Sequence, residues 1–138
     1  MKRYRQLIRA RKWELDGLRR ALAELEAMRA DIEARIDKLD RNLVEEQMLA
    51  ARSNMLGDFG SYAQAAKQRR NAYLASIEEL AVRIAAKHDE VRTAFQDLKT
   101  IEIAAERIAK LALQTEKRRE QALIDDIAIT RHQRQAVS

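Results

Sequence analysis

The sequence predicts an all-α protein in which two long, unequal helices form an antiparallel coiled-coil hairpin. Pro is absent and Gly occurs only three times in 138 residues, so little interrupts helix propagation. Apolar residues recur at heptad spacing on both sides of one Gly-containing segment, which is typical of a supercoiled seam. One Trp, three Tyr and two Phe are too few to fill a globular core. We therefore expect residues 1–138 to form a single hairpin domain.

The first helix is expected to span about residues 2–52. Steps of alternately four and three residues from Tyr4 pass through twelve positions, ten of them apolar. A stripe of this length predicts one continuous face that packs against another helix. The positions are Tyr4, Ile8, Arg11, Leu15, Leu18, Leu22, Leu25, Arg29, Ile32, Ile36, Leu39 and Leu43.

The connecting loop is expected at residues 53–61. This segment contains Gly57 and Gly60 together with Ser, Asn and Asp, the residue types that end and restart helices. Gly17 also interrupts a helical pattern, at a cost of about 1 kcal/mol relative to Ala. We interpret Gly17 as a close-packing point within the first helix.

The second helix is expected to span about residues 62–134. Its stripe, again with a period near 3.5, has eleven apolar members among thirteen. They are Tyr73, Ile77, Leu80, Ile84, Lys87, Val91, Ala94, Leu98, Ile101, Ala105, Ile108, Ala112 and Thr115.

Antiparallel pairing about the loop brings Ile36 opposite Ile77 and Leu80, and it ends near Leu113. About twenty residues of the second helix are then left without a partner from the first. Arg29 and Lys87 fall near one level of the seam. Their stems can snorkel with the heads in solvent, or the polar pair can specify one heptad register at a cost in stability.

Charge is concentrated at the open end of the predicted hairpin. Residues 1–20 contain eight basic and two acidic residues, and residues 107–138 contain seven and four. Residues 21–106 carry a net −4. A positive end attracts acidic protein surfaces, nucleic acid or anionic lipid. Nucleic-acid binding is not expected, because no stacking aromatics are interleaved with the basic residues.

The sequence offers no candidate active site, metal site or cofactor site. It has no Cys and no Gly-rich phosphate loop. His88 and His132 lack partner ligands at metal-binding spacings. From these observations together we expect no enzyme activity. The longest stretch without charge runs over residues 59–66, much less than the roughly 20 residues that span a bilayer. We therefore expect a cytoplasmic protein without direct membrane insertion.

The segment Arg118-Arg119-Glu120-Gln121, followed by Asp125-Asp126, Ala128 and Arg131, resembles the closing signature of the FliJ family of flagellar type III export stalk proteins. The basic first helix, the Gly-containing turn, Tyr73 with Leu74 after it, and the longer second helix also resemble that family. Members form two-helix coiled coils similar to the central stalk of rotary ATPases.

The resemblance implies two partners, the hexameric export ATPase ring and the cytoplasmic domain of the export gate, and it allows export chaperones as further partners. The chain would then be cytoplasmic and peripheral to the inner membrane through the export apparatus. We predict ATPase docking by the open end, through Arg3, Arg5, Arg9, Arg11, Lys12, Lys117, Arg118, Arg119, Glu120, Gln121, Asp125, Asp126 and Arg131. The candidates for gate contact near the tip are Met48, Phe59, Tyr62 and Tyr73, for each of which packing against the turn is an equal alternative.

Two other functions fit the same residues. The chain can be a structural coiled coil in which each helix pairs with another chain, or a cytoplasmic chaperone that grips export clients. An injectisome protein would share the flagellar pattern. Mass and shape in solution distinguish a hairpin from a dimer, and client capture without an effect on an ATPase would indicate a chaperone.

Overall fold

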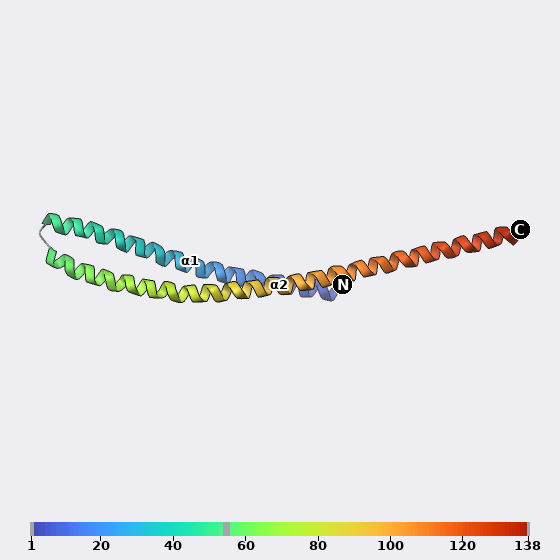
Figure 1. Ribbon diagram of the computed structural model, residues 1–138, viewed down its shortest axis with the longest axis horizontal. Coiled ribbons are helices and arrows are strands. Elements are labelled where there is room, and N and C mark those ends of the chain that lie inside the picture. The colour runs from blue at the N-terminus through green and yellow to red at the C-terminus, as the bar shows by residue number, and fades with distance from the viewer. Residues whose placement is uncertain (1, 54–55, 138) are drawn as a thin grey trace. The chain divides into compact units, whose positions relative to one another are not determined.

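The computed structural model describes residues 2–53 and 56–137, and all of them are helical. Helix α1 spans Lys2–Ser53 and helix α2 spans Leu56–Val137, with 52 and 82 residues. Figure 1 shows the two helices. The described residues contain no strand. The prediction of two unequal helices that pack against each other is confirmed.

The predicted stripe of α1 is the face that becomes buried. Leu15 and Ile36 retain 3% and 8% of their exposure, and the other stripe positions are at least half-buried, with one exception. The exception is Arg29, whose guanidinium lies in solvent and donates a hydrogen bond to Glu33 over 3.0 Å. Heptad spacing therefore identified the packing face of this helix correctly.

The stripe of α2 is buried over most of its length. Leu80, Ile84 and Leu98 are buried, and the stripe positions between them are half-buried. Lys87 keeps its stem in the seam while its ammonium pairs with Glu90 at 2.7 Å. Because the heads of Arg29 and Lys87 each find a carboxylate on their own helix, the polar notch matches the snorkelling interpretation.

The chain divides into two units. One comprises Met1–Trp13 with Phe95–Ser138, and the other comprises Glu14–Ala94. The first, which we call the terminal unit, contains fourteen Lys and Arg against seven Asp and Glu, a net +7. The second, the tip unit, contains thirteen against fifteen, a net −2. The charge asymmetry predicted along the sequence therefore follows the structural division.

Two contacts between the helices show that they run antiparallel within the tip unit. Arg70 Nε donates to Asp40 Oδ1 over 3.1 Å, and His88 Nε2 lies 3.5 Å from Glu26 Oε1. Moving from the first contact to the second, the residue number falls along α1 and rises along α2. Buried Ala50 and Ala66 lie nearer the turn, where their small side chains leave room for close approach of the helices.

The loop is shorter than the predicted 53–61. Helix α1 includes Ser53 and α2 begins at Leu56, so Gly57 and Gly60 are helical, while residues 54 and 55 lie outside the described part of the chain. Neither glycine has the positive φ that ends a helix. Asp58 stands in the first turn of α2, where its charge interacts favourably with the helix dipole. Glycine composition alone overestimated the loop, because Gly weakens a helix without forbidding it.

The interpretation of Gly17 as a close-packing point is wrong. Helix α1 runs through this residue without a break. A methyl group built at Gly17 would meet no atom within 4 Å outside the local backbone. The glycine is half-buried, yet no neighbour requires its lack of a side chain.

No helix in residues 2–53 and 56–137 is long and apolar enough to cross a membrane.

Candidate functional site

Within the terminal unit, the C-terminal part of α2 is exposed to solvent on all sides. Ala109 is the last half-buried residue of the helix, and every residue from 110 to 137 is exposed. We call residues 113–137 the free end. Figure 1 shows this end, orange to red, running past the start of α1. At 1.5 Å per residue the exposed stretch is roughly 40 Å long. The predicted overhang is present, and burial ends slightly before Leu113.

Where α1 does pair within this unit, it forms a shallow groove with α2. The groove has a volume of about 380 Å³ and is lined by Tyr4, Arg5, Ile8 and Lys12 of α1 with Glu102, Ala105, Glu106 and Ala109 of α2. Two acidic residues thus share the groove with two of the candidate cations. Part of the positive charge of α1 is therefore balanced within the unit.

Eight of the nine candidate cations occupy two neighbouring stretches of the terminal unit, and the ninth, Arg131, lies farther along α2. Arg3, Arg5, Arg9 and Lys12 are exposed on α1, whereas Arg11 is half-buried in the seam. The cations of residues 117–119 lie beyond the level at which α1 begins, because Tyr4 and Ile8 already face Ala105 and Ala109. The two sets are therefore successive along the unit and not side by side.

The C-terminal motif residues lie on a regular, solvated helix. Gln121 Nε2 donates to Asp125 Oδ1 over 3.1 Å, and Thr130 Oγ1 donates to the carbonyl oxygen of Asp126 over 2.9 Å. Both are contacts within one turn, and they leave the guanidinium groups of Arg118, Arg119 and Arg131 exposed. This arrangement is suited to binding an acidic surface through many weak contacts, and not to catalysing a reaction.

Sequence reasoning missed two features of this unit. Trp13 is 74% exposed and stands four residues after Arg9, on the same side of α1. Trp and Arg are enriched among the residues that contribute most to binding at protein interfaces. Leu123, Ile124 and Ile127 are also more than half exposed. Both features could have been predicted from the sequence. Trp13 lies off the apolar stripe of the first helix, and the apolar stripe of the second helix ends at Thr115.

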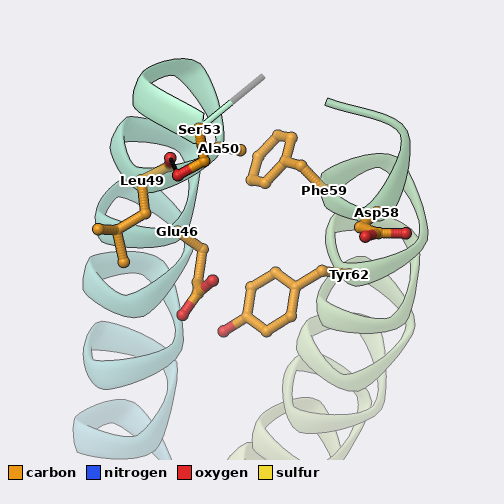
Figure 2. Close-up of a pocket in the computed structure, with 7 residues that line it drawn as sticks. All are labelled: Glu46, Leu49, Ala50, Ser53, Asp58, Phe59 and Tyr62. Carbon is orange, nitrogen blue, oxygen red and sulfur yellow. Dashed lines mark hydrogen bonds between the residues drawn. The ribbon is translucent and has the colours of Figure 1, made fainter. Parts of the chain in front are cut away.

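A second candidate surface lies at the turn, in the tip unit. A pocket of about 280 Å³ is lined by Glu46, Leu49, Ala50 and Ser53 of α1 and by Asp58, Phe59 and Tyr62 of α2. Figure 2 shows the rings of Phe59 and Tyr62 pointing from α2 toward α1. Phe59 is half-buried and Tyr62 is 38% exposed.

The four gate candidates therefore differ in what they offer a partner. Tyr73 is half-buried on the seam face, and Phe59 packs into the pocket between the helices. Met48 is exposed, and Val44 and Leu49 beside it are exposed as well. These three residues, which we call the tip patch, extend the candidate surface beyond the residues that the sequence singled out. Contact with the gate itself stays a prediction.

Among the described residues, no group of three or more His, Asp or Glu side chains is placed to hold a metal ion. The four carboxylates that line the two pockets described above, at positions 46, 58, 102 and 106, lie in open grooves and not in enclosed apolar pockets of the kind that tune an acid for catalysis.

The family model described as "Flagellar FliJ protein" matches residues 1–136. The chain belongs to the FliJ family. Two relatives named "Flagellar FliJ protein", from the NA1000/CB15N and ATCC 19089/CB 15 strains of Caulobacter vibrioides, are each 31% identical over 126 residues, which is 91% of this chain and 91% of the relative. No solved structure matches significantly. The resemblance seen in residues 118–131 is thus confirmed over nearly the whole chain, which is a component of flagellar protein export.

Proposed function

We propose that this FliJ-family chain is a non-enzymatic stalk and coupling factor of the flagellar export apparatus. The terminal unit docks on the hexameric export ATPase, and the tip unit contacts the cytoplasmic domain of the export gate. The chain is held at the cytoplasmic side of the inner membrane through these partners. It acts by binding and contributes no catalytic group.

The observation that carries the proposal is the exposed free end beside a strongly basic segment. All residues from 113 to 137 are exposed, and the unit that contains them has a net +7. A cationic surface accelerates encounter with an acidic partner. The exposed apolar residues of the free end then supply area that is buried on docking.

Docking gives a route to coupling without catalysis. If the terminal unit binds the assembled ring more tightly than free ATPase subunits, thermodynamic linkage requires it to promote ring assembly. ATP turnover then rises because more subunits are in the active assembly. The tip unit, with its net −2, is left available for the gate.

The test is the rate of ATP hydrolysis by the export ATPase as a function of stalk concentration. We expect wild type to raise the rate, and Arg118→Glu with Arg119→Glu to weaken this effect and its dependence on salt. The matched control is Lys67→Glu with Arg69→Glu, which reverses two exposed cations of the tip unit. Equal stimulation by the Arg118/Arg119 variant and wild type at low salt would refute docking through the free end.

A further inference from the structure

One face of the free end carries acidic residues first, apolar residues next and basic residues last along the helix. Because α2 is a continuous α-helix here, residues spaced by three, four, seven or eleven lie on one side. One such side holds Glu116 and Glu120 first, an apolar centre next, and Arg131 and Arg134 last. The apolar centre is Leu123, Ile124 and Ile127, which are 62%, 58% and 54% exposed.

This face is complementary to itself when reversed. Glu120 and Arg131 lie equally far on either side of the midpoint between Asp125 and Asp126, and so do Ile124 and Ile127. A two-fold axis through that midpoint places each glutamate opposite the arginine of the other copy and each isoleucine opposite an isoleucine. Symmetric dimers are built from such self-complementary patches.

We propose that the free end pairs antiparallel with the free end of a second copy of this chain. The face buries its apolar centre against the same centre of the other copy, and the Glu120–Arg131 pair forms twice. This pairing buries apolar residues that we propose are also buried on ATPase docking, so the two are mutually exclusive. The pairing requires no ATPase and is tested without one.

The charges on this face also conflict within one chain. Glu116 and Glu120 are four residues apart, and Arg131 and Arg134 are three apart, so each pair repels along the helix. Within the described part of the chain, neither Glu120 nor Arg131 takes part in an ion pair. Antiparallel pairing relieves both repulsions at once, whereas parallel pairing would bring like charges together.

The remaining charges of the free end do not oppose the pairing. Residues 113–137 contain five Lys and Arg against four Asp and Glu, so two copies repel little in spite of the +7 of the whole unit. Asp125 lies on another side of the helix, where it accepts a hydrogen bond from Gln121. An interface of one helix face per chain is small, so we expect weak association at concentrations of roughly 10–100 µM.

The test is sedimentation equilibrium of the full chain from about 1 µM to about 500 µM. Wild type is expected to show a monomer–dimer equilibrium. Glu120→Arg alone and Arg131→Glu alone each place like charges opposite one another twice, and each should raise the dissociation constant about tenfold. Asp97→Arg and Arg107→Glu make the same changes of net charge outside the free end and should leave the dissociation constant unchanged.

The decisive sample is an equimolar mixture of the two single variants. The Glu120→Arg chain then presents two arginines to the two glutamates of the Arg131→Glu chain, so a heterodimer should form with about the wild-type dissociation constant. Circular dichroism of each variant checks that it is still helical. A wild type that stays monomeric at the highest concentration overturns the proposal, and so does a mixture that associates no better than its components.

Discussion

Arg70 of α2 donates a hydrogen bond from Nε to Oδ1 of Asp40 in α1 over 3.1 Å, across 30 residues of sequence. Both side chains are about 45% exposed. The contact joins the two helices of the tip unit at one defined register. Because solvent screens the pair, its energy is small, and the register must be maintained mainly by the apolar seam.

We expect the Asp40–Arg70 pair to contribute less than about 1 kcal/mol to the free energy of unfolding. The measurement is a double-mutant cycle of Asp40→Ala and Arg70→Ala by urea denaturation. A coupling energy of several kcal/mol would show that polar contacts, and not the seam, maintain the register.

Leu80→Asp is expected to destabilise the protein by about 3 kcal/mol or more, because it places a carboxylate where the leucine is 7% exposed. Val82→Asp is the matched control, since Val82 is two residues away on the same helix and 71% exposed. We expect the control to change the unfolding free energy by less than about 0.5 kcal/mol. Equal midpoints of thermal unfolding for the two variants would contradict the assignment of the seam.

Gly17→Ala is expected to stabilise the protein by about 0.5–1 kcal/mol, since a methyl group fits without a clash and Ala has the higher helix propensity. The same denaturation experiment measures it. A loss of stability would mean that a neighbour approaches Gly17 more closely than the structure shows.

Met48→Glu is expected to weaken binding to the cytoplasmic domain of the export gate at least about fivefold, because it places a charge in the tip patch. Met28→Glu is the control, as Met28 is similarly exposed on the same helix, away from the tip patch. Titration calorimetry with the isolated gate domain measures both. If the two variants bound the gate equally well, contact through the tip patch would be disproved.

The sequence was sufficient to predict the fold because heptad spacing reports directly which side of a helix is buried. Leu15, Ile36, Leu80 and Leu98, all stripe positions, are among the buried residues of the structure. The length of the turn was harder to predict. Gly57 and Gly60 have low helix propensity, yet both are part of helix α2.

The candidate surfaces were predicted less completely than the fold. The order of charges along the chain located the terminal unit correctly, but composition does not tell which cations share a groove with Glu102 and Glu106. Trp13 is exposed because it lies off the stripe, and the apolar residues at 123, 124 and 127 are exposed because burial on α2 ends at Ala109. Both signals were present in the sequence, because the two stripes taken together place the end of pairing near Leu113.

The most direct test of ATPase docking is hydrogen–deuterium exchange of the stalk, alone and with the assembled export ATPase. Amides in residues 113–137 have no packing partner from α1 and should exchange through local opening when the chain is alone. We expect the ATPase to slow their exchange, together with that of residues 2–12, and to leave residues 46–62 unchanged. Protection confined to residues 46–62, with none in the free end, would contradict docking through the terminal unit.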